Sequence, residues 1–398
     1  MAFYKYVAKD GSNRVIKGII EAPTKVEAKR QLRLKGYRKI LEVNVSRDAA
    51  KDNKLRRLTL KEKIDFTQTF QILHKAGVPI IESLKFLGNE AATPGIRSIA
   101  NAVRQEILGG STFAGTIAKY TNIFDRIYIG LVKAGEDSGE MDKTLGRLAE
   151  LLCKQAAINT RVVGALLYPV FVVLLALVIF VVMIVFIFPK FAEAFSSTGK
   201  PLPPITQFCI DLGTNMKSFW YIYVLAAVLI AWLCVNLPKW PASRKVLDKW
   251  ALKIPVISNL VIKANFSNYL SVLLVSYNAG IPIVDSLYLS TLTLTNVVLK
   301  DALEGVSKKV QQGAHMSQAM KSSNVVPKMV DFMVATGEQS GRLGELLDNA
   351  VVFIDQELDK AIDIMTKMME PLLIVVIGAI VLFLALALYL PLFGMADF

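Results

Sequence analysis

Three uninterrupted apolar runs dominate the hydropathy of this 398-residue chain. They cover 166–188, 219–237 and 371–390, and none of them contains Asp, Glu, Lys, Arg or His. A helix needs about 20 apolar residues to cross the hydrocarbon core of a bilayer. The pattern therefore predicts an integral membrane protein of the all-α class with three transmembrane helices over these ranges.

Outside the apolar runs, the chain repeats one pattern of helix and turn residues about 200 positions later. The segment 76–84, Ala-Gly-Val-Pro-Ile-Ile-Glu-Ser-Leu, returns at 279–287 as Ala-Gly-Ile-Pro-Ile-Val-Asp-Ser-Leu. Likewise Gly-Glu-Asp-Ser-Gly at 135–139 returns at 337–341 as Gly-Glu-Gln-Ser-Gly. Self-similarity at a fixed offset is the signature of a duplicated structural unit. Each copy combines a water-facing helical domain with an apolar run.

Apolar residues spaced three and four apart predict that each repeated domain is a bundle of about six short helices. The first bundle is expected over 59–165 and the second over 238–370, with its core at 262–365. In the first, one helix should end at Gly77 and Pro79 should start the next. Glycine favours the end of a helix and proline favours the start of one. The Gly-Val-Pro segment at 77–79 is therefore expected to join two antiparallel helices.

One continuous helix is expected to connect each bundle to its apolar run. No glycine-proline break separates the Gly-Glu-x-Ser-Gly motif from Pro169 in the first copy or from Pro371 in the second. Both helices carry an apolar stripe at steps of four, three and four. The stripes are Met141, Leu145, Leu148 and Leu152, and Leu343, Leu347, Ala350 and Ile354. A kink is expected near the membrane surface at each internal proline.

The first 45 residues have a different character from the rest of the chain. The segments 3–8 and 15–20 are typical of strands around a turn, and 40–45 reads as a third strand after a capped helix. This pattern predicts a small ββαβ module over 1–45. The following residues, 46–58, are charged and have few apolar groups to bury, which indicates a linker.

The distribution of basic residues predicts the orientation in the membrane. Of 46 Lys and Arg residues, three lie in 189–218, between the first two apolar runs, and none follows the third run. The positive-inside rule places 1–165 and 238–370 in the cytoplasm. It leaves 189–218 as an outer, periplasmic loop and 391–398 as an outer C-terminal tip.

The formal charge of +13 does not indicate a nucleic-acid partner. Cytoplasmic loops of membrane proteins are basic, and no zinc-finger, basic-zipper or ribonucleoprotein motif is present. The charges nearest the apolar runs suit the anionic headgroups of the lipid bilayer. Cys153, Cys209 and Cys234 are expected in a cytoplasmic helix, the outer loop and the second span, so they predict no disulfide framework.

The sequence contains no catalytic motif. There is no phosphate-binding Gly-x-x-x-x-Gly-Lys loop, and the two histidines, His74 and His315, have no Cys or carboxylate at the spacing of zinc ligands. We therefore expect a protein that is not an enzyme and has no cofactor. A solute transporter is the alternative from a different functional class of membrane protein. Transporters keep ionisable residues inside their spans to carry protons or ions, and these apolar runs have none.

An acidic cluster precedes the helix that leads into the first apolar run. Glu136, Asp137 and Glu140 are weak candidates for a metal site, because carboxylates at a helix start could hold a divalent cation. They could equally complement the helix dipole. The second copy keeps Glu338 alone of these acids, which favours the structural role, and no metal is assigned. Glu136 and Glu338 are expected to accept hydrogen bonds from backbone N–H groups.

Taken together, these motifs resemble the type II secretion F family over essentially the whole chain. The residues that carry the resemblance are interpreted as turns and caps that set the fold. They are Gly77, Pro79, Gly135, Glu136, Ser138, Gly139 and Pro169 in the first copy, and Gly280, Pro282, Gly337, Glu338, Ser340, Gly341 and Pro371 in the second.

The resemblance implies a non-enzymatic platform protein of the bacterial inner membrane. Such a protein couples a cytoplasmic hexameric ATPase for assembly or retraction to the insertion or extraction of pilin subunits. Family members are dimers or higher oligomers and contact the alignment subcomplex of the inner membrane. The expected machine is a type IV pilus, since pilus-type systems form the larger class. The alternative is the equivalent platform of a type II secretion system, which builds a pseudopilus.

Overall fold

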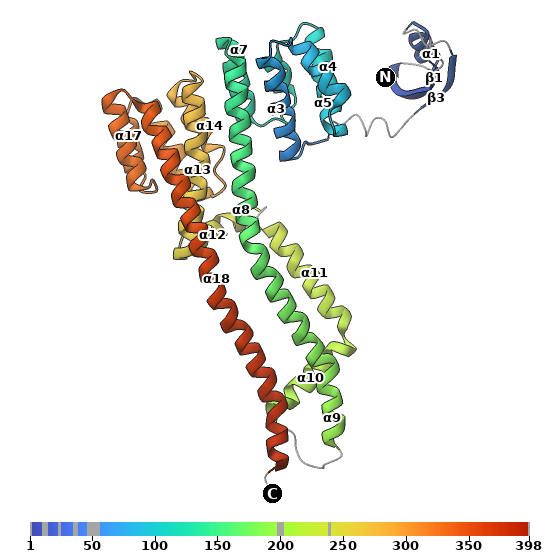
Figure 1. Cartoon of the computed structure of the whole chain (residues 1–398), viewed down its shortest axis with the longest axis vertical. Helices are drawn as coiled ribbons and strands as arrows, with labels where there is room; N and C mark the ends of the chain where they lie inside the picture. Colours follow the sequence, from blue (N-terminus) through green and yellow to red (C-terminus); the bar gives the residue numbers. More distant parts are fainter. Residues whose placement is uncertain are drawn as a thin grey trace. The chain divides into compact units, whose positions relative to one another are not determined.

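The computed structural model describes residues 2–9, 15–22, 25–34, 39–45, 56–196, 203–237 and 240–396. The chain divides into two compact units, Met1–Asp125 and Arg126–Phe398. Helices make up most of the described residues in both (Figure 1). The boundary falls inside the range predicted for the first bundle, 59–165.

Unit one begins with three antiparallel strands. The strand β1 (Ala2–Lys9) pairs with both β2 (Val15–Ala22) and β3 (Lys39–Val45), which gives the sheet order β2-β1-β3. Between β2 and β3 the chain forms α1 (Lys25–Leu34), whose Leu32 is fully buried. Of the predicted linker 46–58, the part before residue 56 lies outside the described residues.

The remainder of unit one is helical. Its helices are α3 (Leu60–Lys75), α4 (Ile80–Glu90), α5 (Pro94–Leu108) and α6 (Phe113–Lys119). A reciprocal capping box starts α3, because Thr59 and Glu62 each bond the other's backbone N–H. The predicted stop and restart is confirmed, since Gly77 has φ +81° after α3 and Pro79 is the N-cap of α4.

Unit two starts with α7 (Arg126–Ser138) and α8 (Met141–Val182) and later contains the second bundle. The helices of that bundle are α13 (Pro255–Asn278), α14 (Ile283–Thr291), α15 (Val297–Gln311), α16 (Met316–Ser322), α17 (Lys328–Ser340) and the first part of α18 (Leu343–Ala396). Along the chain, the series from α13 to α18 repeats the series from α3 to α8.

Glycines in the left-handed region mark the same three turns in both copies. They are Gly77, Gly110 and Gly139 in the first copy and Gly280, Gly313 and Gly341 in the second. A Cβ is strained at such φ values, so each turn requires glycine for backbone reasons. The duplication inferred from the motifs is thus repeated in the backbone geometry.

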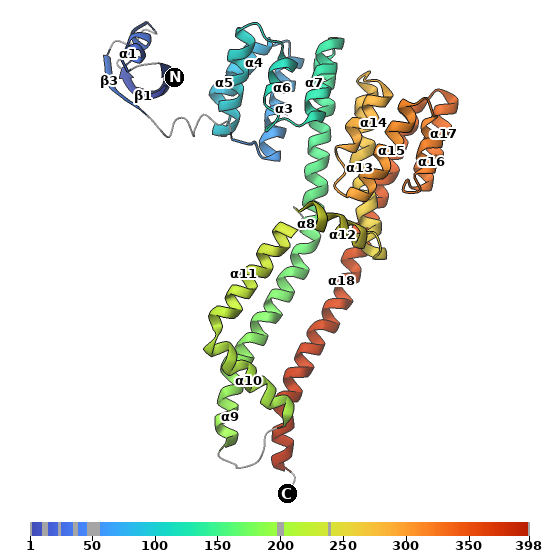
Figure 2. The same ribbon diagram turned by 180° about the vertical axis from the view of Figure 1, so that it is seen from behind.

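The two long helices α8 and α18 run in the same direction within unit two (Figures 1 and 2). Each passes through its internal proline, Pro169 or Pro371, without a break in the helix. The prediction of one continuous helix per repeat is therefore confirmed. Both predicted apolar stripes face protein interior: all their residues are buried except Leu343, which packs against the core of the second bundle.

Two helical stretches among the described residues are long and apolar enough to cross a membrane. They are Met141–Glu193 and Leu343–Pro391. The second of the predicted spans, 219–237, corresponds to a shorter apolar helix, α11 (Trp220–Asn236). Its described side chains from 220 to 229 are all exposed.

The segment 189–218, expected as an outer loop, contains helices. A π-helix η1 (Met183–Ile187) leads into α9 (Phe188–Ser196), and α10 (Pro204–Ser218) packs back against η1 and α18. Gly213 permits this contact, because a Cβ there would overlap the carbonyl oxygen of Ile184. The loop prediction missed this packing because the apolar residues of α10 are interspersed with polar ones.

Candidate functional site

The joint between α7 and α8 depends on Gly135, one of the predicted motif residues. A Cβ on Gly135 would lie 2.8 Å from Cβ of Thr144 and 3.3 Å from Cα of Met141. The second copy has the same arrangement between α17 and α18, where a Cβ on Gly337 would lie 3.0 Å from Cα of Leu343. The missing side chain therefore lets the two helices of each joint approach closely.

The motif serines of the two copies form local hydrogen bonds near the end of their own helix. Ser340 Oγ donates to the carbonyl of Thr336 at 2.7 Å. Ser138 Oγ lies 3.4 Å from both the carbonyl of Gly135 and the N–H of Glu140. The structure thus places both serines at a helix end, beside the turn glycine that follows.

Glu338 is the best-connected residue of the second joint. Its carboxylate accepts hydrogen bonds from the backbone N–H groups of Met316 and Ser317, at 2.9 and 3.0 Å, and from Ser317 Oγ at 2.6 Å. His315 Nδ1 lies 3.3 Å away. Burial raises the pKa of the Glu338 carboxyl, but these hydrogen bonds stabilise the ionised form and hold the pKa below its usual range. Glu338 thereby ties the joint to the start of α16.

The acidic cluster of the first copy is spread over two elements. Glu136 and Asp137 belong to α7, whereas Glu140 is the N-cap of α8 and pairs with Lys143 at 2.6 Å. Within the described ranges, no group of three or more His, Cys, Asp or Glu side chains is arranged to hold a metal ion. Asp137 instead lines a cleft.

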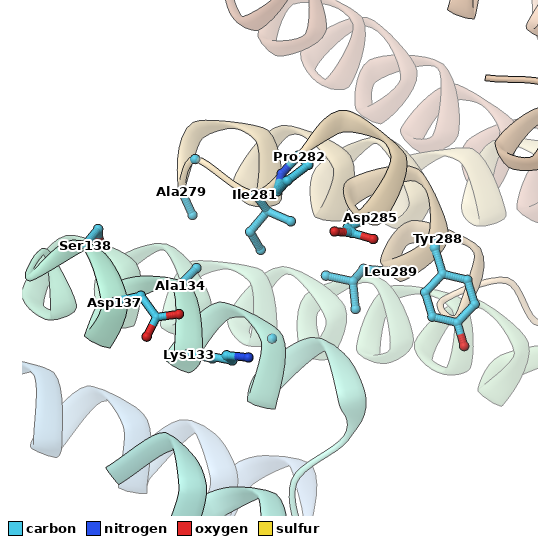
Figure 3. Close-up of a pocket in the computed structure, with 12 residues that line it drawn as sticks. Lys133, Ala134, Asp137, Ser138, Ala279, Ile281, Pro282, Asp285, Tyr288 and Leu289 are labelled. Atoms are coloured by element: carbon cyan, nitrogen blue, oxygen red, sulfur yellow. The ribbon is translucent and has the colours of Figure 1, made fainter. Parts of the chain in front are cut away.

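That cleft lies between α7 and the start of α14, as Figure 3 shows. It has a volume of about 610 Å³. Lys133, Asp137 and Ser138 line one side, and the 279–282 turn with Asp285 lines the other. The end of the first copy's Gly-Glu-Asp-Ser-Gly motif thus faces the Ala-Gly-Ile-Pro turn of the second copy, a juxtaposition that neither motif predicts alone.

Beyond the cleft, three basic residues of α8 contact the second bundle. Arg147, Lys154 and Arg161 are seven residues apart, which is two helical turns, so they lie on one face of α8. We call these residues and their partners the polar seam. Arg147 Nη1 donates to the carbonyl of Asn278 at 2.7 Å, and Arg161 pairs with Asp359 of α18.

Lys154 is at the centre of the polar seam. Its Nζ lies 2.6 Å from Oδ2 of Asp355 on α18 and donates to Ser271 Oγ of α13, also at 2.6 Å. Asp355 in turn accepts a hydrogen bond from Ser267 Oγ at 2.6 Å. The Lys154 and Asp355 side chains are 25% and 35% exposed, so the pair is partly shielded from water.

A further ion pair joins α13 to α18 within the second bundle. Lys263 Nζ lies 2.8 Å from Glu357, and Lys360 lies 3.0 Å from the same carboxylate. The hydrogen bond from Lys263, joined by that from Lys360, holds the pKa of Glu357 below its usual range. Sequence reasoning used the basic residues of α8 for orientation alone. The signal that could have identified the seam is a pair of spacings. Basic residues recur every seven positions on α8, and two acids, Asp355 and Asp359, lie four positions apart on α18.

Further along, contacts between the two long helices become wholly apolar. Val173, Leu177 and Phe180 of α8 line one wall of a pocket whose other wall is formed by Val376 and Ile380 of α18. The structure therefore pairs the two helices through charges near the bundle and through hydrocarbon side chains within the predicted spans.

Comparisons with known proteins match both copies. The family model described as type II secretion system (T2SS), protein F, matches 66–189 and 269–391. The model for the N-terminal domain of type II secretion system protein F matches 1–43. The two longer matches each cover a helical series together with its apolar run.

Characterised relatives come from two kinds of machine. The type IV pilus assembly protein PilC of Thermus thermophilus is 31% identical, over 99% of this chain and 98% of its own length. PilC of Pseudomonas aeruginosa is 30% identical over 83% of this chain and 89% of its own length. The type II secretion system protein F of Vibrio cholerae is 26% identical over 100% of this chain and 99% of its own length. With both copies and the N-terminal segment matched, the chain belongs to the type II secretion system protein F family.

Proposed function

We propose that this protein is the inner-membrane platform of a type IV pilus assembly machine. In this role it couples a cytoplasmic hexameric ATPase for assembly or retraction to the insertion or extraction of pilin subunits, and it is not itself an enzyme. The observation that carries the proposal is the continuity of α8 and α18 from helical bundle to apolar segment. A helix without a break transmits a displacement of one end to the other.

The polar seam supports a coupled movement of the two repeats. Lys154 and Arg161 hold α8 against α18 at the level of the bundle, so a force on the second bundle reaches both long helices. Ion pairs with restricted access to water are stronger than exposed ones. The fold-setting motif residues, from Gly77 to Pro371, serve this function by setting the turns and joints of each copy.

We further propose a multi-pass arrangement with α11 as the third span. At 17 residues α11 is about 26 Å long, close to the hydrocarbon thickness, and its exposed apolar side chains suit a lipid environment. In this arrangement 1–165 and 238–370 lie in the cytoplasm of a bacterial cell, which the distribution of basic residues supports. The assembled platform is a homo-dimer or higher oligomer that also contacts the alignment subcomplex.

A type II secretion platform is the second candidate, because the Vibrio cholerae relative matches the chain over its whole length. Deletion of the gene separates the two. Loss of surface filaments with secretion intact supports the pilus machine, whereas loss of a secreted protein with filaments intact supports the secretion machine.

The coupling itself is tested with the full chain in lipid nanodiscs and the hexameric ATPase of the same organism. We expect the nanodiscs to bind the ATPase and to change its rate of ATP hydrolysis, with empty nanodiscs as the control. No binding together with an unchanged rate would refute the coupling function while leaving the family assignment intact.

A further inference from the structure

One face of α12 (Pro241–Ala251) is fixed to the second bundle. Asp248 accepts a hydrogen bond at 2.7 Å from the backbone N–H of Val297, in the first turn of α15. Four residues earlier, Arg244 donates to the carbonyl of Thr295 at 2.8 Å. Residues four apart lie on the same side of a helix, so these two contacts define the attached face of α12.

The opposite face of α12 is apolar and exposed. At 100° per residue, Val246 lies opposite the attached face, Leu247 lies on one flank, and Trp250 lies between them. Their exposed fractions are 55%, 41% and 61%, and Trp240 just before the helix is 58% exposed. Large apolar side chains grouped in this way mark a surface that binds a partner or a membrane.

Basic residues border this apolar face. Lys249 projects from one flank of α12, and Lys253 lies over the Trp250 ring at 5.3 Å from its centroid, whereas Lys245 Nζ lies 3.6 Å from Oδ2 of Asp301 on α15. Tryptophan on one side with lysines beside it is the composition of helices that lie in the interface of a bilayer. The core of a protein–protein interface, in contrast, is depleted of lysine.

The position of α12 along unit two agrees with such a location. Both views show α12 at the height where α8 and α18 leave the second bundle and their apolar segments begin (Figures 1 and 2). The apolar helix α11 ends at Asn236, five residues before α12 starts. An extended chain of that length spans at most about 18 Å, so α12 stays near the end of α11.

We propose that α12 lies in the headgroup layer of the membrane and binds anionic phospholipids. Val246 and Trp250 enter the acyl boundary, while Lys249 and Lys253 contact lipid phosphates. Because Asp248 ties α12 to α15, this contact fixes the height and tilt of the second bundle above the bilayer. The inference requires a membrane protein but not the pilus function.

Tryptophan quenching tests the location of α12. Replacing Trp220, Trp232 and Trp240 with Phe leaves Trp250 as the sole tryptophan of the full chain, which is reconstituted into phosphatidylcholine vesicles with or without phosphatidylglycerol. The matched control carries W250F and V352W, because Val352 is 49% exposed on α18 and lies about 28 Å before Pro371 along the helix. We expect blue-shifted emission from Trp250 and strong quenching by lipids brominated near the headgroup, but neither for the control. Equal quenching at the two positions would refute membrane binding and assign the apolar face to a protein partner.

The lipid charge is tested with the variant K249Q in the Trp250 background. We expect phosphatidylglycerol to increase the quenching of Trp250 in the parent and this increase to be lost in the variant. The control K308Q neutralises one exposed lysine of α15 and should keep the increase. If K249Q kept it as well, the anionic-lipid assignment would be wrong.

Discussion

Lys154 and Asp355 lie 2.6 Å apart, Nζ to Oδ2, and each comes from the helix that leads one repeat into its apolar segment. Hydroxyl groups of α13 satisfy both partners, Ser271 on the lysine and Ser267 on the aspartate. Three helices are thus joined through one pair of charges. Their contact joins the two repeats at the level of the second bundle.

Breaking this pair should destabilise unit two. We expect K154A to lower the free energy of unfolding by about 1–2 kcal/mol, because Asp355 keeps only its serine hydrogen bond while remaining partly shielded from water. The charge reversal K154D/D355K should recover most of the loss, as measured by chemical denaturation in detergent. K143A, which removes an exposed pair within α8, is the control and should leave stability unchanged. Equal losses for K154A and K143A would contradict a structural role of the seam.

The hydrogen bonds of Glu338 should make stability dependent on pH. Since its pKa is lower in the folded than in the unfolded state, its contribution is complete above the unfolded value of about 4.3 and is lost as pH falls through the folded value. We expect E338Q to be less stable than the parent at pH 7 and the difference to shrink below about pH 4. The measurement is the unfolding midpoint of E338Q and of the parent from pH 7 to below about pH 4. E345Q, which changes an exposed glutamate, is the control. A pH-independent difference would contradict the prediction.

Gly135→Val should prevent the first joint from forming. The valine side chain would collide with Thr144 and with the backbone at Met141, neither of which can move without separating α7 from α8. We expect little protein in the membrane fraction. Gly164→Ala on α8 serves as the control, because a Cβ there meets open space and alanine favours a helix by about 1 kcal/mol. Normal abundance of the valine variant with loss of filaments would instead indicate a direct functional role for Gly135.

Gly213→Ala should release α10 from η1. The added methyl group overlaps the Ile184 carbonyl, and a displaced α10 also loses the 2.6 Å hydrogen bond from Thr206 to the carbonyl of Ala387. Cys209, fully buried on α10, reports this movement. We expect maleimide to modify Cys209 slowly in the parent and quickly in the variant, while T214A on the exposed side of α10 behaves like the parent. Unchanged labelling of Cys209 in the variant would show that α10 is not held by this contact.

Local signals in the sequence predicted the long helices, the turns and the duplication. Gly77 and Pro79 determine a helix end and a helix start through their own backbone preferences, and the stripe from Met141 to Leu152 reflects helical periodicity. These preferences act within a few residues, so they can be read without a structure.

Contacts between distant segments could not be predicted in the same way. The partner of Lys154 lies 201 positions further along, and nothing local to Asp355 indicates it. The close approach at Gly213 and the cleft beside Asp137 likewise depend on how α10 and α14 are placed. The repeated motifs indicated that their glycines are important. Only the structure shows that Gly135 lets α7 and α8 approach closely.

The two copies have diverged where they meet. At the offset that relates Gly139 to Gly341, Lys154 corresponds to Gln356 and Asp355 corresponds to Cys153. The contact between the repeats is therefore heterologous, with different surfaces on its two sides, whereas two identical helices related by a two-fold axis would form an isologous contact. Two copies of α8 would bring like charges together along this face. Because the two copies lie in one chain, the α8 side of the contact carries Arg147, Lys154 and Arg161 and the α18 side carries Asp355 and Asp359, which makes the pair directional.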